Sequence, residues 1–191
     1  MSASRLGPIV KFVAPHVLEV TVTYLEMTKH PKLSPPPAPA ISYRIEKLDN
    51  PSIRFYRYLY NVVGEPWLWH ERRKVSDAAL AGILEDPALW LLVAYAEGEP
   101  AGYAELTGAG RPDIELAYFG IVPKFIGKRL GPTLLHAAVE GVWQRAPRRL
   151  WVHTCSLDHP KALGCYERAG FKIYDRVVRR IRDPRPLPLN L

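Results

Sequence analysis

The chain has 191 residues, of which 48% are hydrophobic and 24% are charged, and it carries two cysteines and a formal net charge of +7. This composition fits one soluble globular domain. It excludes a disordered chain, a disulfide-built scaffold and, because no apolar stretch is long enough, a membrane-spanning protein. The positive charge favours anionic partners such as a polyphosphate cofactor, whereas the Lys and Arg residues are scattered and match no nucleic-acid-binding signature.

The N-terminal part of the chain is predicted to form a β-rich arm. From His16 to Met27 β-branched and polar residues alternate, which is typical of a strand, and the proline-rich stretch Pro31–Pro39 predicts an extended connector. Because an unpaired strand edge invites association, we expect residues 9–27 to pair with the core or with a neighbouring subunit. This divides the chain into an arm with its connector (1–40), a main domain (41–182) and a proline-rich tail (183–191).

The main domain alternates strands and helices. In chain order the pattern predicts a strand at Ile41–Lys47, helices at Ser52–Val63 and Ser76–Glu85, a hairpin of Leu89–Ala96 with Ala101–Leu106, a strand at Ile114–Val122, a helix at Pro132–Gln144, a strand at Leu150–Thr154, a helix at Pro160–Arg168 and a strand from Phe171 to Ile181. We expect Asn50 or Ser52 to cap the first helix, Ser76 and Asp158 to cap two later helices, and Pro132 to lie in a first turn. The order predicts an α/β fold, a mixed sheet flanked by helices, with a ligand at the carboxyl ends of the central strands.

The segment from Glu115 to Gly131 is the most informative part of the sequence. An apolar strand runs into a loop with glycines and the cations Lys124, Lys128 and Arg129, and a helix follows at once. Backbone N–H groups at a helix N-terminus form a cradle for phosphate, and the cations would add charge beside it. Two glycines also occur in plain tight turns, so the loop alone leaves both interpretations open.

This loop resembles a motif of the GNAT superfamily, the acetyl-CoA-dependent N-acetyltransferases. Its pyrophosphate loop reads Gln/Arg-x-x-Gly-x-Gly/Ala, and the segment Ile126-Gly-Lys-Arg-Leu-Gly131 lies on that pattern. Gly131 matches. Ile126 stands where Gln or Arg is usual and loses a side-chain contact to phosphate, and Arg129 stands where the first Gly is usual.

A second block strengthens the resemblance. Asp158–Phe171 is similar to the superfamily's late motif Asn-x-x-Ala-x-x-x-Tyr-x-x-x-Gly-Phe, and His159 stands at the Asn position, directly after Asp158. The residues in register with this motif are Ala162, Tyr166, Gly170 and Phe171. Two motifs in the right order are more specific than either alone, and the resemblance covers about residues 41–182.

The resemblance implies a GNAT-like sheet and acetyl-CoA as cosubstrate. It implies that Ile121 and Val122 offer backbone N–H groups to the thioester carbonyl and to the pantetheine amides. The remaining residues implied at the cofactor are Ile126, Gly127, Lys128, Arg129, Leu130, Gly131, Pro132 and Asp158.

The chemistry of amine acetylation requires a proton acceptor, because an aliphatic amine with a pKa near ~10 is mostly protonated at neutral pH. Glu115 stands where a branch of the superfamily, which includes histone acetyltransferases, keeps its general base, and Glu105 is the reserve. Tyr166 matches the superfamily's tyrosine acid. A salt-bridge role for Glu115 and simple packing for Tyr166 stay open as alternatives, and His153 and His159 are expected to be structural.

An aromatic cluster follows the first predicted strand, where this fold usually shapes the substrate pocket. Phe55 and Tyr58 are expected to pack in the core. The residues expected to bind substrate are Tyr56, Tyr60, Trp67 and Trp69, because aromatic walls suit a small amine.

We therefore expect an N-acetyltransferase that acts on a primary amine of a small molecule. One alternative is a protein lysine or N-terminal acetyltransferase, which needs an open groove. Another is a non-catalytic acyl-CoA-binding or nucleic-acid-binding module, which needs neither Glu115 nor Tyr166. The two cysteines lack zinc-site spacing, and we expect a cytoplasmic enzyme without bound metal, alone or as a homodimer, that contacts neither membrane nor nucleic acid.

Overall fold

The computed structural model describes residues 10–14 and 16–185. The start of the arm and most of the expected tail lie outside these residues. Within them, eight strands pair into one sheet: β1 (Lys11–Ala14), β2 (Val17–Met27), β3 (Tyr43–Leu48), β4 (Trp90–Ala96), β5 (Glu99–Thr107), β6 (Asp113–Ile121), β7 (Arg149–Cys155) and β8 (Lys172–Arg182). The helices are α1 (Ile53–Gly64), α2 (Glu71–Lys74), α3 (Asp77–Leu84), α4 (Leu130–Trp143) and α5 (Ala162–Arg168), with short 3₁₀ turns η1 (Glu65–Trp67) and η2 (Pro123–Phe125).

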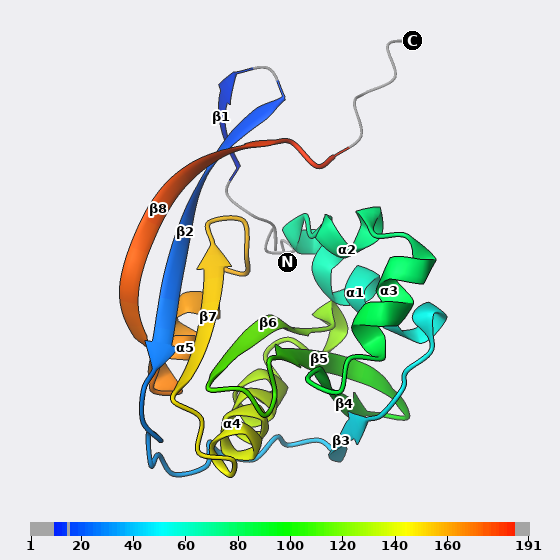
Figure 1. Cartoon of the computed structure of the whole chain (residues 1–191), viewed down its shortest axis with the longest axis vertical. Helices are drawn as coiled ribbons and strands as arrows, with labels where there is room; N and C mark the ends of the chain where they lie inside the picture. Colours follow the sequence, from blue (N-terminus) through cyan, green and yellow to red (C-terminus); the bar gives the residue numbers. More distant parts are fainter. Residues whose placement is uncertain (1–9, 15, 186–191) are drawn as a thin grey trace.

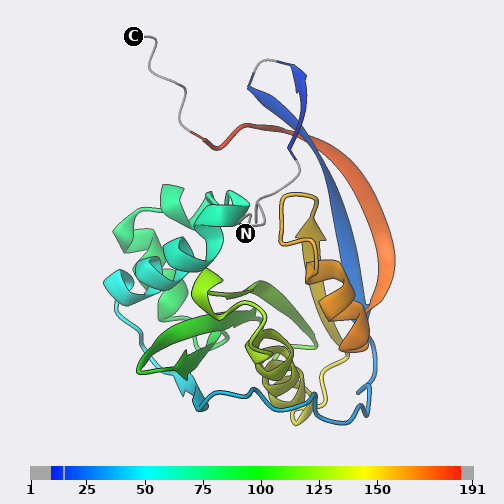
Figure 2. The same cartoon turned by 180° about the vertical axis from the view of Figure 1, so that it is seen from behind.

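Helices cover both faces of the sheet, so the expected α/β fold is confirmed. The helices α1 and α3 pack on one face against side chains such as Leu91, Val93 and Tyr103. The helices α4 and α5 pack on the other face against Ala104 and Leu106, among others, and Figure 2 shows this side. Within the described part, no helix is long and apolar enough to cross a membrane.

The N-terminal strand β2 is an interior strand of the sheet. It pairs antiparallel with β7, from Val22 opposite Cys155 to Met27 opposite Leu150, and antiparallel with β8 on its other side. Figure 1 shows the long β2 and β8 curving together beside β7. The expectation that the arm pairs with the core is confirmed, and the pairing lies within the same chain.

The strands β6 and β7 are parallel neighbours that separate along their length. Their pairing runs only from Asp113 opposite Arg149 to Leu116 opposite Val152, although β6 continues to Ile121. Figure 1 shows the two strands diverging toward their carboxyl ends. Beyond Leu116, the main-chain groups of β6 that face β7 therefore have no partner in the β6–β7 ladder.

Local sequence signals explain where the helices begin. Ser52 Oγ accepts from Phe55 N at 3.2 Å and Ser76 Oγ accepts from Ala79 N at 3.3 Å, so both expected caps are confirmed. The helix α4 begins two residues before Pro132, which therefore lies in its first turn as expected.

Two local features differ from the sequence expectation. The hairpin of β4 and β5 turns in two residues, Glu97 and Gly98, both with positive φ, so β5 begins at Glu99. The helix α2 lies in a stretch predicted as a connection. A helix of one turn leaves no hydrophobic period in the sequence, and tertiary contacts hold it.

Candidate functional site

A cavity of about 770 Å³ lies where β6 and β7 separate. Eleven of the residues expected at the site line it: Glu115, Tyr166, Ile121, Ile126, Gly127, Arg129, Gly131, Pro132, Asp158, Trp67 and Trp69. Five expected residues do not line it: Val122, Lys128, Leu130, Tyr56 and Tyr60. The two motifs and the two tryptophans are therefore brought to one place.

The strand β6 directs alternate amides into the gap between the strands. Val122 N donates to Ala101 O at 2.9 Å, so this amide faces β5. Because successive amides alternate along an antiparallel strand, the amides of Ile121 and Phe119 face the side where β7 has diverged. The expectation is therefore wrong for Val122, whose amide is already bonded to Ala101, whereas the amides of Ile121 and Phe119 both face the gap.

The loop before α4 has the backbone shape of an anion cradle. Gly127 and Arg129 have positive φ values of 90° and 64°, and Arg129 immediately precedes the 14-residue helix α4. A Cβ built on Gly127 would meet nothing within 4 Å, and one on Gly131 would meet only Ile121 Cγ1 at 3.5 Å. The space above both glycines is open, and the amides of Leu130 and Gly131 lie at the helix N-terminus, which fits a phosphate group.

The cations near this loop differ in what they face. Lys128 Nζ lies 2.9 Å from Glu97 Oε1, and Lys124 Nζ lies 3.3 Å from Glu97 Oε2 and also contacts Glu99. The carboxylates of the β4–β5 turn therefore neutralise both lysines. Among the described residues, the exposed Arg129 has no ion-pair partner, and it lines the cavity.

Glu115 lies on the cavity wall beside a histidine. Its Oε1 is 3.4 Å from His153 Nδ1 on β7, and a quarter of the Glu115 side chain is exposed. The His153 ring lies against the rings of Tyr24 and Trp151, with centroid distances of 5.9 and 6.2 Å. The hydrogen bond to Glu115 raises the pKa of His153 above its ordinary value, although burial opposes this shift.

Glu105 lies beneath the cavity and is fully buried. Its Oε1 accepts from Arg72 Nη2 at 2.5 Å, and its Oε2 accepts from the Tyr56 hydroxyl. Burial raises the pKa of Glu105, although Arg72 and Tyr56 oppose this. Glu105 does not line the cavity, so the arrangement favours Glu115 over this reserve as the residue with access to a substrate.

The two tyrosines expected to bind substrate support other residues. Tyr56 and Tyr60 are almost completely buried. The Tyr60 hydroxyl donates to Glu71 Oε2 at 3.1 Å and accepts from Arg72 N at 3.3 Å. Their position on the buried face of α1 explains the difference: they contact residues that line the cavity, such as Arg72 and Trp69, but do not line it themselves.

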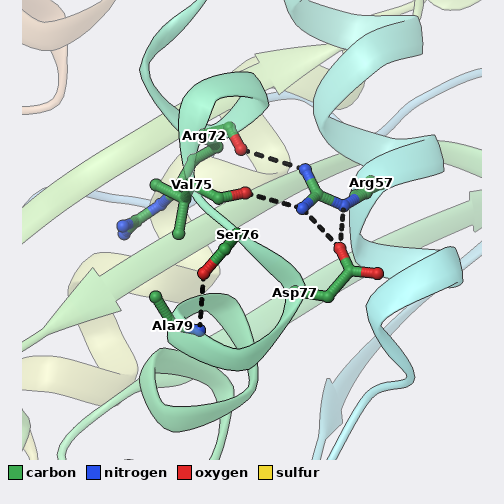
Figure 3. Close-up of polar contacts among 6 residues, drawn as sticks. All are labelled: Arg57, Arg72, Val75, Ser76, Asp77 and Ala79. Carbon is green, nitrogen blue, oxygen red and sulfur yellow. Dashed lines mark hydrogen bonds and ion pairs between the residues drawn. The ribbon is translucent and has the colours of Figure 1, made fainter.

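The short helix α2 is fixed by a guanidinium clamp (Figure 3). Arg57 on α1 donates to Arg72 O at 3.1 Å and to Val75 O at 2.8 Å, and its Nη2 lies 2.7 Å from Asp77 Oδ1. These bonds satisfy carbonyl groups around the end of α2. They also fix the main chain that carries Glu71 and Arg72 to the cavity.

Tyr166 lies on α5 among aromatic side chains and at the cavity wall. Its ring centroid is 5.9 Å from those of Phe119 and Phe171. Burial raises the pKa of Tyr166 well above its ordinary value. The hydroxyl therefore stays protonated at neutral pH.

Asp158 was expected to cap the last helix, and this is wrong. The helix α5 begins at Ala162 without a side-chain cap. Asp158 Oδ2 accepts from Thr154 Oγ1 at 2.7 Å and from Cys155 N at 2.8 Å, and its Oδ1 accepts from Trp69 Nε1 at 3.3 Å. The Asp158 carboxylate therefore bonds to the end of β7 and to Trp69 across the cavity. It lies in the turn after β7, before α5 starts, and so it is not available as a helix cap.

Several lining residues were missed by sequence reasoning. They come from segments that meet only in the folded chain: Tyr24, Glu71, Arg72, Tyr118, His153 and Arg179. The alternation in β2 could have suggested one cavity-facing row, but not its place beside β7. In residues 10–14 and 16–185, no three His, Cys, Asp or Glu side chains lie close enough to hold a metal ion.

Comparisons with known proteins agree with this geometry. A family model described as the acetyltransferase (GNAT) family matches residues 54–171, which excludes β2 and β8. A putative [ribosomal protein bS18]-alanine N-acetyltransferase of Bacillus subtilis (strain 168) is 28% identical over 129 residues, covering 68% of this chain and 77% of that protein.

Two solved structures share the fold. A GCN5-related N-acetyltransferase from Sphaerobacter thermophilus has a TM-score of 0.58 at 20% identity; the match covers 87% of this chain and 52% of that one. An aminoglycoside acetyltransferase from an uncultured soil metagenomic sample has a TM-score of 0.57 at 14% identity, with 67% and 87% covered. This chain thus spans about half of the Sphaerobacter protein.

Proposed function

Since this chain belongs to the acetyltransferase (GNAT) family, whose members transfer an acetyl group from acetyl-CoA to an amine, we propose that its acceptor is the primary amine of a small molecule. One observation carries this proposal. The segment after α1 spans one end of the cavity, where Trp69 bonds to Asp158 and Trp67 lies against the His159 ring at 5.0 Å. An end closed by aromatic rings suits a small amine better than a protein segment.

The residues around the cavity suit acetyl-CoA, which supplies an acyl group activated as a thioester. The amides of Leu130 and Gly131, with the Arg129 side chain, would bind the pyrophosphate. The amides of Phe119 and Ile121 would bind the pantetheine arm and polarise the thioester carbonyl. Both sets line or adjoin one cavity, so a single extended molecule can reach both.

Glu115 is the residue we assign to proton removal. The acceptor amine must lose a proton, and Glu115 is a carboxylate on the cavity wall. His153 holds it from the side through the 3.4 Å contact. Tyr166 stays protonated at neutral pH and lines the same cavity, so it is the residue we assign to protonation of the departing thiolate, which needs little help because thiols ionise at about 8.5.

Acetylation of a protein, at its N-terminus or at a lysine, is the second candidate, because the name of the Bacillus subtilis relative is that of a putative ribosomal protein alanine N-acetyltransferase. A protein substrate requires an open groove for its chain. The contacts of Trp67 and Trp69 argue against such a groove at this end of the cavity. A module that only binds acyl-CoA would need neither Glu115 nor Tyr166.

The experiment that tests the proposal is thiol release from acetyl-CoA across two sets of acceptors. One set contains small primary amines and the other contains peptides with free N-termini or lysines. We expect turnover with members of the first set and little with the second. Turnover confined to peptides would overturn the small-molecule acceptor, and tight acetyl-CoA binding without turnover of any amine would favour the binding module.

A further inference from the structure

We propose that Arg72 forms a subsite for a carboxylate of the acceptor, so that the substrates are amino-carboxylates, small molecules with both an amine and a carboxylate. This inference rests on the proposed function, because it specifies the acceptor of the same cavity. Three features carry it: Arg72 is held rigidly, it keeps unused N–H groups at the cavity, and it lies near carboxylates that would hold an ammonium.

Buried groups hold the guanidinium of Arg72 in one orientation. Nη2 donates to Glu105 Oε1 at 2.5 Å, and Nε donates to the Tyr56 hydroxyl at 3.1 Å. Its Cζ lies 5.2 Å from the centroid of the Tyr118 ring. A charged side chain fixed in this way loses little conformational freedom when it binds a ligand.

The main chain at Arg72 is held as well. Arg72 N donates to the Tyr60 hydroxyl. Figure 3 shows the other bond, in which Arg72 O accepts from Arg57. These hydrogen bonds stabilise a helix of only one turn, which would fray without them. Its consequence is a guanidinium that stays in one place at the cavity wall.

Part of the hydrogen-bonding capacity of Arg72 is unused. A guanidinium has five N–H groups, and Glu105 and Tyr56 account for two of them. Among the described residues, Nη1 donates to no group, and it is not among the atoms sealed from solvent. The side chain is 17% exposed and lines the cavity. An ion pair with a purely structural role in the core would have both side chains buried. In the pair of Arg72 and Glu105, only Glu105 is fully buried.

The surroundings match a ligand that carries both charges. Arg72 and Glu115 line the same cavity, and the ion pair between Arg72 and Glu105 is at its wall. Glu71 also lines the cavity; burial raises its pKa, but hydrogen bonds from the main chain and from Tyr60 outweigh this, so it is an anion at neutral pH. An ammonium would bind beside these acids while a carboxylate binds Arg72.

The test uses two binding probes that lack an amine and differ in one group, 3-phenylpropionate and 3-phenylpropionamide, measured by calorimetry. The variant Arg72→Gln/Glu105→Gln replaces both charges of the pair by amides of similar size, which avoids a buried unpaired charge. Glu105→Gln alone is the matched control, because it keeps Arg72. A cooperative melt and wild-type affinity for acetyl-CoA verify the fold of each variant.

We expect the wild type to bind the carboxylate at least about tenfold more tightly than the amide. The double variant should lose about 10- to 100-fold in affinity for the carboxylate and less than about threefold for the amide, the range of a charge-assisted hydrogen bond. Glu105→Gln should keep the preference. Absence of a preference in the wild type, or its persistence in the double variant, overturns the subsite.

The same variants separate this inference from the proposed function. L-Phenylalanine and L-phenylalaninamide serve as acceptors, and the ratio of their kcat/KM values in wild type and double variant cancels their different reactivities. Loss of the carboxylate preference in the double variant supports the subsite. Turnover of amines that is independent of Arg72 overturns the subsite and leaves the proposed function. Arg72-dependent binding of the carboxylate without any amine turnover supports the subsite and overturns the proposed function.

Discussion

Replacing Arg72 by alanine should destabilise the protein in a pH-dependent way. The change removes the cation bonded to Glu105, whose side chain is fully buried. Leaving one member of a buried ion pair without its partner costs about 3–5 kcal/mol. For a domain with a total stability of about 5–15 kcal/mol, this is a large part of the free energy of unfolding.

The sign of the pH dependence follows from Glu105. Its folded-state pKa is already raised above the ordinary value of 4.5, chiefly by burial, and loss of Arg72 raises it further. A carboxyl group with a raised folded pKa destabilises the fold at pH values above the unfolded pKa, and this penalty grows until pH exceeds the folded pKa. The loss in Arg72→Ala should therefore be smaller at pH 5 than at pH 8, because a lower pH favours the protonated form of the buried Glu105.

Urea unfolding at both pH values measures this effect. With a slope of about 2 kcal/mol/M, the variant's midpoint should fall by about 1.5–2.5 M at pH 8. Arg73→Ala is the matched control, because Arg73 is exposed and its Nε donates to Asn61, so its midpoint should hardly move. The variant Arg72→Ala/Glu105→Gln should regain much of the stability. An equal loss at pH 5 and pH 8 would refute the reasoning.

Three further predictions concern the cofactor loop, the histidine and the N-terminal strand. Gly131→Glu should weaken acetyl-CoA binding in calorimetry, because it places a negative charge in the cradle, whereas Gly131→Ala should be tolerated, because its Cβ would meet Ile121 at an ordinary 3.5 Å; unchanged affinity in Gly131→Glu would contradict the loop assignment. NMR titration should give His153 a pKa above 6.5 that falls in Glu115→Gln, and the stability from this pair should be lost as pH rises through that pKa; an unchanged pKa would exclude the contact. Amides of Val17–Met27 should exchange as slowly as those of β7, and fast exchange throughout would be inconsistent with an interior strand.

The sequence was sufficient for the order of the main elements and for the loop before α4. Local signals decided these features: serine caps at Ser52 and Ser76, glycines before α4, and alternation in the strands. These features depend on neighbours along the chain, which a sequence displays directly.

Features that depend on register or on distant contacts were not predictable. Whether the amide of Val122 or that of Phe119 faces the cavity depends on the register between β5 and β6. A bulge at Ala117 shifts this register by one residue. Asp158 looked like a cap because its partners, Thr154 and Trp69, lie before it in the chain. The role that we propose for Arg72 depends on its contact with the buried Glu105, and nothing in the sequence indicates that these two residues meet.

The turnover of Glu115→Gln tests the central claim most directly. This change keeps the shape and polarity of the side chain and removes its ability to accept a proton. With an amine that the wild type acetylates, the folded variant should bind acetyl-CoA nearly normally while turnover falls by about 10²–10⁴-fold, and raising the pH should restore part of the rate because more amine is unprotonated in solution. Wild-type turnover in this variant would contradict the assignment of Glu115 as the residue that removes the proton.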